Sequence, residues 1–215
     1  MTYYMNLLSK GTNGAYVALI LLVLALIFIF LQAILAFGRG TSRSVARFFS
    51  VIIAAVVALY ATRVVGRAFL PAKTLGELIP IKSARLAPIL EASVAELLLP
   101  IVFIFLFVVC ALFIVIPYKL FCGIFGFSYA RNNPLTRWFS VLVGAVHALM
   151  AFVIVFLPFF SCVRAYQGYA KELPESSAAA FYEQYLEDTA QSPIYRYTMK
   201  YVGDRTLRWF ENSHK

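Results

Sequence analysis

Long runs without a charged residue constrain this chain more than any other feature of its sequence. Three such runs cover residues 11–38, 97–118 and 138–163. Each of them exceeds the roughly 20 residues that an α-helix needs to cross about 30 Å of hydrocarbon. The chain is 62% hydrophobic and only 13% charged, which is far from the composition of soluble domains. These features predict an all-α integral membrane protein.

A shorter run predicts a fourth transmembrane helix. Residues 48–62 are uncharged, and they would form roughly 22 Å of helix at about 1.5 Å per residue. Arg47 at one end and Arg63 or Arg67 at the other would then reach the head groups with their long side chains. The first run is longer than the apolar region of a signal peptide, and we expect it to be retained as a span.

Two segments of the chain resemble one another closely. Residues 47–59 read RFFSVIIAAVVAL and residues 137–149 read RWFSVLVGAVHAL, with eight of the thirteen letters identical. A repeat at this spacing predicts that spans 1–2 and spans 3–4 form two hairpins. Because spans 2 and 4 run in the same direction, the repeat would be of the parallel kind that some transporters use.

Small side chains recur at every fourth position of both copies, on one side of each helix. Lipid supplies no hydrophobic force between helices, so close approach of small residues is what holds such helices together. We therefore expect spans 2 and 4 to form the central contact of the fold. The alternative is that these residues only contribute to general bundle packing. The candidate helix-packing residues are Ser50, Ala54, Ala58, Thr62, Ser140, Gly144 and Ala148.

Few residues inside the spans could support chemistry. His147 is the only ionisable side chain well inside a long run, and polar groups at that depth are functional candidates by default. It is either a structural histidine bonded to a neighbouring helix or a proton-linked or gating residue. The sequence has no Cys-x-x-Cys pair, no metal cluster, no phosphate-binding glycine loop and no catalytic triad. We predict no enzymatic activity, no cofactor and no metal site.

Basic residues lie in two short loops that contain no acid. The first loop carries Arg39 and Arg43, and the second ends at Arg137, so we take these three as further candidate functional residues. Their density favours a cytoplasmic position for both loops, with both chain termini outside. The formal net charge of +9 is spread over several membrane boundaries. This distribution favours contact with anionic head groups over binding of nucleic acid.

The polar segments outside the spans also carry helical patterns. Residues 83–99 place leucine and valine on one side, which suits an amphipathic surface helix between spans 2 and 3, the alternative being a re-entrant loop. We divide the chain into a four-helix transmembrane domain, 1–163, and an aromatic-rich tail, 164–215. In the tail, Ser176 or Ser177 and the Ser192–Pro193 pair predict the starts of two helices at the membrane surface.

The two basic motifs resemble a known family. Residues 39–43, Arg-Gly-Thr-Ser-Arg, are similar to the RG-x-x-R signature of the colicin V production protein (CvpA) family. Residues 137–148 resemble that family's second signature, D-R-x-L-G followed by G-x-x-R-G, with Thr136, Ser140, His147 and Ala148 in place of its Asp, Gly, Arg and last Gly. The substitution by His147 weakens any role that depends on a fixed charge, because a buried imidazole tends to be neutral.

The resemblance implies a multi-pass protein of the bacterial cytoplasmic (inner) membrane. It would serve as a scaffold or accessory factor in colicin or toxin production and secretion and in envelope homeostasis, with an unknown protein partner. A second hypothesis is a small transporter or channel-like subunit, which would have to be a homo-oligomer because one chain buries few polar groups. Flux that responds to His147→Ala would distinguish the two.

Overall fold

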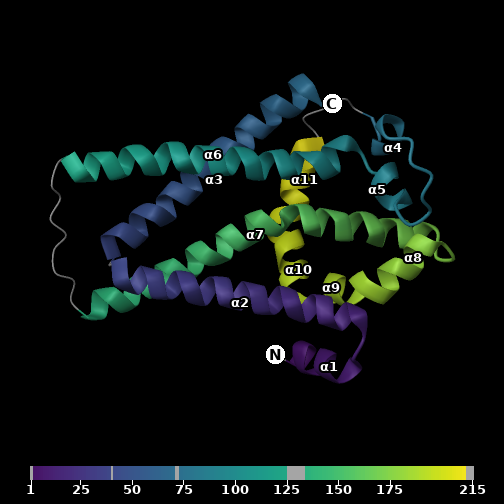
Figure 1. Ribbon diagram of the computed structural model, residues 1–215, viewed down its shortest axis with the longest axis horizontal. Coiled ribbons are helices and arrows are strands. Elements are labelled where there is room, and N and C mark those ends of the chain that lie inside the picture. Colours follow the sequence, from purple (N-terminus) through teal and green to yellow (C-terminus); the bar gives the residue numbers. More distant parts are fainter. Residues whose placement is uncertain (1, 40, 71–72, 125–133, 212–215) are drawn as a thin grey trace. The chain divides into compact units, whose positions relative to one another are not determined.

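The computed structural model describes residues 2–39, 41–70, 73–124 and 134–211, and every regular element within them is a helix (Figure 1). Four helices are long and apolar enough to cross a membrane. They are α2 (Asn13–Arg39), α3 (Thr41–Phe69), α6 (Val94–Ile124) and α7 (Pro134–Glu172). The prediction of an all-α chain with four candidate spans is confirmed, and this makeup is that of a multi-pass membrane protein.

The second span is longer than its uncharged run. Helix α3 has 29 residues, which is roughly 43 Å at about 1.5 Å per residue. The helix continues through Arg63 and Arg67 at its far end. There the Arg63 guanidinium carbon lies 4.9 Å from the centre of the Trp209 ring, within the range of a cation–π contact. Arg63, the first cation after the uncharged run, therefore packs on the ring of Trp209 in the tail.

The chain forms two compact units. The first contains Met1–Val23, Arg63–Ile101 and Phe156–Lys215, and the second contains Leu24–Thr62 and Val102–Val155. Each long helix gives one end to each unit. The tail shares its unit with the N-terminal segment and with the ends of the spans. The predicted division at residue 163 into a transmembrane domain and a tail stays a prediction.

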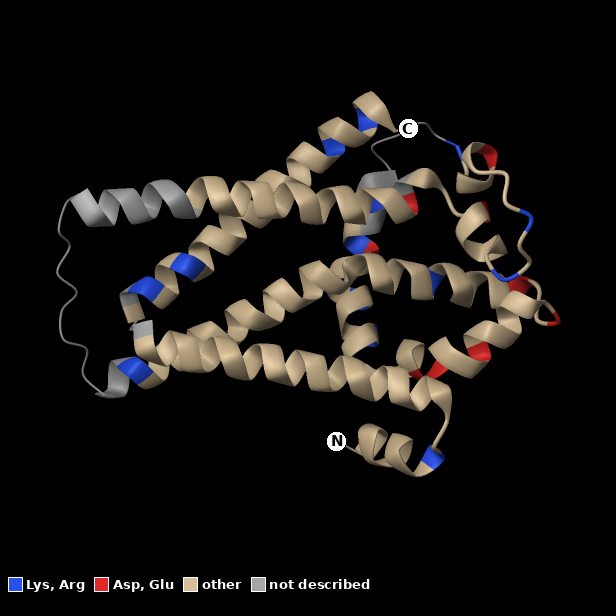
Figure 2. Ribbon diagram, viewed as in Figure 1, with Lys and Arg blue, Asp and Glu red and all other residues tan. Residues whose placement is uncertain are grey.

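Charge is divided between these units. All ten acidic residues of the chain belong to the first unit. Figure 2 shows those that the structure describes in red. The second unit contains cations and no acidic residue; its cations are Arg39, Arg43, Arg47, Lys119, Arg131 and Arg137. Of the loops that carry them, residues 40 and 125–133 lie outside the described part of the chain.

The connection between spans 2 and 3 folds back on itself. It contains the short helices α4 (Leu75–Leu78) and α5 (Ala87–Glu91). The Val94 amide donates to the Lys73 carbonyl at 2.9 Å, and this bond closes the base of the connection. Because Ala92 is extended, with φ −66° and ψ 146°, α5 ends there. The structure therefore does not confirm a single surface helix over 83–99, since residues from Val94 onward belong to α6.

The tail contains the two predicted helices. The first runs through α8 (Ser177–Phe181), the π-helical turn η1 (Tyr182–Leu186) and α9 (Glu187–Gln191). The second runs through α10 (Pro193–Thr198), the π-helical turn η2 (Met199–Gly203) and α11 (Asp204–Glu211). Ser176 accepts a hydrogen bond from the Ala179 amide, and Ser192 accepts one from the Tyr195 amide. Both predicted N-caps are thus confirmed, with Pro193 at the first position of its helix.

The second tail helix packs against the C-terminal half of α7. The rings of Tyr195 and Phe160 meet edge to face with centroids 5.7 Å apart, and both residues are buried. Phe160 belongs to the apolar part of α7, three residues before the uncharged run ends. The tail therefore covers apolar surface of the fourth span as well as polar surface beyond it.

Candidate functional site

The small residues of α7 lie against α2. A Cβ atom added at Gly144 would be 2.5 Å from the Ala36 Cβ and 3.0 Å from the Gln32 carbonyl oxygen. Only glycine therefore fits at this position without movement of a helix. The neighbouring Ser140 is fully buried, and its hydroxyl donates to the Ala36 carbonyl at 3.0 Å. We call this set, Gln32, Ala36, Ser140 and Gly144, the helix contact.

The Ala36 carbonyl needs such a donor because of its place in the chain. It lies in the last turn of α2, where carbonyl groups have no partner within the helix. The hydroxyl of Ser44 on α3 also points to this carbonyl, at 3.5 Å. Serines from α3 and α7 thus converge on the end of α2. The hydrogen bond of Ser140 thus joins spans 4 and 1.

The small residues at every fourth position of α3, which we call its stripe, are buried as well. Ala54, Ala58 and Thr62 have no exposed surface, and Ser50 is half-buried. The Thr62 hydroxyl donates to the Ala58 carbonyl at 2.7 Å, and the Ser50 hydroxyl donates to the Ala46 carbonyl at 2.8 Å. These two hydroxyls are satisfied within their own helix. Direct contact between the stripes of α3 and α7 stays a prediction, although Ala148 of α7 is also fully buried.

The candidate charged residues do not share one environment. Arg137 is exposed and lies over the ring of Phe37, with its guanidinium carbon 5.9 Å from the ring centre. Its carbonyl oxygen lies 2.6 Å from the Ser140 hydroxyl, whose one proton is shared between this carbonyl and that of Ala36, so Arg137 borders the helix contact. Arg43 is exposed in the first turn of α3, and His147 is half-buried in α7. The side chain of Arg39 lies outside the described part of the structure.

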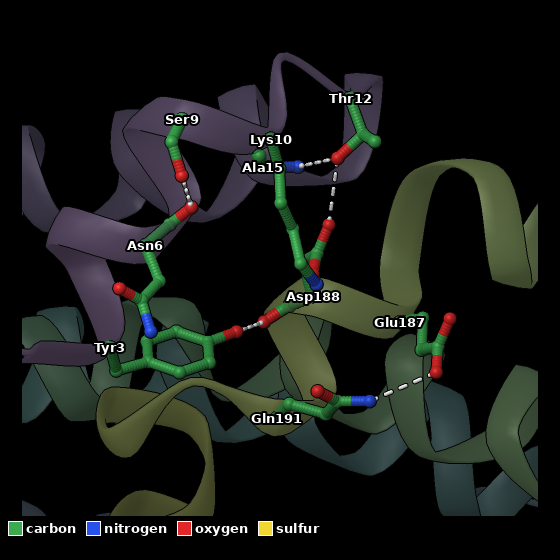
Figure 3. A network of polar contacts seen from close by, with 9 residues as sticks. All are labelled: Tyr3, Asn6, Ser9, Lys10, Thr12, Ala15, Glu187, Asp188 and Gln191. Atoms are coloured by element: carbon green, nitrogen blue, oxygen red, sulfur yellow. Dashed lines mark hydrogen bonds and ion pairs between the residues drawn. The ribbon is translucent and has the colours of Figure 1, made fainter.

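The first unit contains a polar network that the sequence did not predict (Figure 3). It joins the N-terminal helix α1 (Thr2–Lys10) to Asp188 of the tail. Lys10 Nζ lies 3.2 Å from one carboxylate oxygen of Asp188, and the Thr12 hydroxyl donates to the other at 3.0 Å. The Tyr3 hydroxyl donates to the Asp188 carbonyl. We call Tyr3, Lys10, Thr12 and Asp188 the N-terminal latch.

The turn between α1 and α2 brings these groups together. Gly11 adopts φ +61°, a left-handed conformation that glycine adopts without strain and other residues rarely adopt. Thr12 then precedes α2, and its hydroxyl accepts a hydrogen bond from the Ala15 amide at 3.3 Å. A Cβ atom added at Gly14 would be 3.0 Å from an Asp188 carboxylate oxygen. The turn therefore leaves just enough room for the carboxylate.

Burial favours the protonated form of the tyrosine in the latch. Desolvation raises the pKa of Tyr3 to about 12, and the negative charge of Asp188 adds to this effect. The phenol therefore remains a hydrogen-bond donor at any physiological pH. The Asp188 side chain is only 11% exposed, whereas that of Lys10 is 54% exposed, so the ion pair has a covered carboxylate and a solvent-facing ammonium group.

Local sequence signals could have located one half of the latch. A Gly-Thr-Asn-Gly segment before a long apolar run is a typical helix start, and it points to Thr12 as a capping residue. Nothing in the sequence links that segment to Asp188, which lies 176 residues further along the chain. The pairing depends on how the tail folds back, which local patterns do not encode.

The described residues hold no group of three or more His, Cys, Asp or Glu side chains that could bind a metal ion. The polar groups of the helix contact and of the N-terminal latch hold helices together. No protein-family model, curated protein or solved structure matches the chain. The resemblance of residues 39–43 and 137–148 to the CvpA signatures therefore stays an expectation.

Proposed function

We propose that this chain is a CvpA-like scaffold or accessory protein of the bacterial cytoplasmic membrane, which acts in colicin or toxin production and secretion and in envelope homeostasis. The observation that supports this proposal is the folded tail. Its two helices are capped by Ser176 and Ser192 and joined to α1 by the N-terminal latch. A scaffold needs an ordered surface of this kind outside its spans.

The energetics of the tail favour a role in binding. Ordering a residue costs about 1–2 kcal/mol of conformational entropy, so a polar tail folds only where its contacts offset that cost. The buried side of the tail supplies such contacts through Tyr195 and Met199. On the other side, Tyr197 and Tyr201 are 65% and 54% exposed and stack with centroids 6.2 Å apart. Exposed aromatic residues of this kind are typical of binding surfaces.

Several finer features belong to the same proposal. The four spans form two parallel-repeat hairpins, and spans 2 and 4 touch along their small residues. A surface helix precedes span 3, the tail lies near anionic head groups, and the protein catalyses no reaction. The chain assembles with a protein partner through the tail, and a homo-oligomer is one form of that assembly.

A complementation experiment tests the scaffold role. In a toxin-producing host that lacks this protein, wild-type chain should restore toxin release, and Tyr197→Ser with Tyr201→Ser should not. Tyr60→Ser is the matched control, because Tyr60 is 62% exposed on α3 and lies outside the tail. A site-specific photo-crosslinker at position 197 should capture one discrete protein, whereas the same probe at position 60 should not. Full toxin release by the double variant would contradict the proposal.

The transporter hypothesis makes a separate prediction. His147 is half-buried within a candidate span, which is the environment expected for a residue along a pathway. Purified chain in liposomes would then carry ions or small solutes, and His147→Ala would change that flux. Flux at the liposome background would favour the scaffold.

A further inference from the structure

A cleft of about 920 Å³ opens in the first unit, where α1, the end of α7 and the second tail helix come together. Tyr197, which stacks on Tyr201, is one of its lining residues, and the cleft differs from that stack in its charge. The side chains that concern us are Arg164, Gln167, Arg196, Lys200 and Asp204. They come from α7 and from the consecutive elements α10, η2 and α11.

Cations outnumber carboxylates in this lining. Arg196 and Lys200 are exposed and lie four residues apart, so they project from the same side of the helix. Arg164 approaches from α7. Asp204 is the one carboxylate among the lining residues that the structure describes, and its Oδ1 lies 3.5 Å from Arg164 Nη1. The cleft therefore carries an excess of positive charge.

The pairing of Arg164 leaves donor capacity unused. At 3.5 Å the contact with Asp204 is long for a charge-assisted hydrogen bond, which is normally about 2.7–2.9 Å. Arg164 Nη1 is buried and makes no hydrogen bond to any described residue. A buried guanidinium nitrogen without a hydrogen bond costs free energy, and the long contact with Asp204 compensates the Arg164 charge only in part. The Arg164 side chain is 32% exposed and lines the cleft, so part of it faces a ligand there although Nη1 is covered.

The position of the cleft along the chain places it near a polar–apolar boundary. Arg164 is the first charged residue after the uncharged run 138–163. Tyr195 lines the cleft and also packs on Phe160, which belongs to that run. Buried apolar rings of the tail and of α7 thus lie behind the cleft, and its lining presents cations. Phosphate groups of lipids lie at such a boundary, next to the hydrocarbon.

We propose that this cleft binds a phosphate group through Arg164, Arg196 and Lys200. Guanidinium groups match the geometry of phosphate oxygens, and a lysine adds a mobile point charge. The phosphate belongs either to the head group of an anionic phospholipid or to a soluble phosphate compound, and the chemistry of recognition is the same for both. This inference concerns a ligand site, and it holds whether or not the chain acts as a scaffold.

Calorimetric titration of the purified full chain in a neutral detergent tests the site. The three probes are short-chain phosphatidylglycerol, short-chain phosphatidylcholine and inorganic phosphate. The test variant is Arg196→Gln with Lys200→Gln, and both residues are exposed, so the fold should tolerate the change. The matched control is Arg205→Gln with Arg208→Gln, which removes the same charge from exposed positions of the same helix that do not line the cleft.

Loss of two charged donors should weaken phosphatidylglycerol binding by about tenfold or more, whereas the control should change it by less than about twofold. Preference for phosphatidylglycerol over inorganic phosphate identifies a lipid as the source. Equal dependence of inorganic phosphate binding on the test variant supports the site with a soluble ligand. Equal weakening by both variants would mean attraction by bulk charge and would overturn the proposal, as would binding of phosphatidylglycerol and of inorganic phosphate that the test variant leaves unchanged.

Discussion

Gly144 lies at a close approach of α7 to α2 in the second unit. An added methyl group would collide with the Ala36 Cβ at 2.5 Å and approach the Gln32 carbonyl oxygen at 3.0 Å. Both atoms are fixed to the α2 backbone, so a side-chain rotation cannot relieve the clash. We expect Gly144→Ala to lower the free energy of unfolding by about 1–3 kcal/mol, the usual cost of overpacking. Unfolding in mixed micelles, followed by circular dichroism, measures this change.

Gly168 supplies the control on the same helix. A Cβ atom added at Gly168 meets nothing within 4 Å. Replacement of a helical glycine by alanine without a clash stabilises a helix by about 0.5–1 kcal/mol. Gly168→Ala should therefore be neutral or stabilising. Equal stability of the Gly144 and Gly168 variants would show that α2 and α7 do not meet at Gly144.

Asp188 is the residue on which the N-terminal latch depends. Asp188→Asn keeps the size of the side chain but removes the charge that faces Lys10 and Thr12. Loss of a hydrogen bond to a charged group costs about 1–3 kcal/mol, so amide exchange in α1 should accelerate by roughly 5- to 150-fold. Hydrogen exchange with mass spectrometry on residues 2–10 measures it.

A neighbouring acid provides the comparison for this substitution. Glu187 is exposed, and the hydrogen bond recorded for its side chain comes from Gln191 within the same helix, at 2.9 Å. Glu187→Gln should therefore leave exchange in α1 unchanged. Similar acceleration by both variants would mean that the general charge of the tail, and not the latch, holds α1.

At the scale of elements, the attachment of α1 depends on pH through Tyr3. Its pKa is raised from 10.0 to about 12, first by burial and then by the Asp188 charge. A raised folded-state pKa means that the protonated phenol stabilises the attachment fully below about pH 10 and that this contribution is lost as the pH rises through 12. Subtracting the tyrosinate absorbance titration of Tyr3→Phe from that of the wild type should give a midpoint near pH 12.

The same subtraction in denaturant provides the reference. The unfolded chain exposes Tyr3 to water, so the midpoint of the difference should return to about pH 10, the ordinary value for tyrosine. A midpoint near 10 in the folded protein would show that the phenol is not held in the latch. Burial also raises the pKa of Tyr195, which is why a single-residue difference is needed to isolate Tyr3.

The helices could be predicted from the sequence where neighbouring residues determine them. Uncharged runs predicted the four long helices, and Ser176, Ser192 and Pro193 predicted the tail helices because capping depends on neighbours in sequence. The extended backbone at Ala92, which divides residues 83–99, lacks a comparable signal. The partner of Gly144 was also not predictable, because a small residue shows which face packs but not which helix it meets.

At the scale of the whole molecule, the separation of charge predicts the orientation of the protein in a membrane. The second unit has six cations and no acid, whereas all ten acids lie in the first unit with the N-terminal latch and the cleft. The cations of the second unit lie in or beside two short loops, and Lys and Arg in short loops are what retains a loop in the cytoplasm. The side of the membrane that receives the first unit then determines which leaflet supplies any lipid to the cleft.

We expect the loop that joins α2 to α3 to be cytoplasmic and the tail to lie on the outer side of the cytoplasmic membrane. In a variant whose native cysteines are replaced, Ser177→Cys should react with a membrane-impermeant maleimide in spheroplasts. Thr41→Cys should react only after the membrane is permeabilised. Position 177 is exposed at the first turn of α8 and position 41 is at the first turn of α3, so both sites lie at helix starts. The reverse labelling pattern would move the latch, the cleft and every tail partner to the cytoplasm, because an even number of spans keeps both termini on one side.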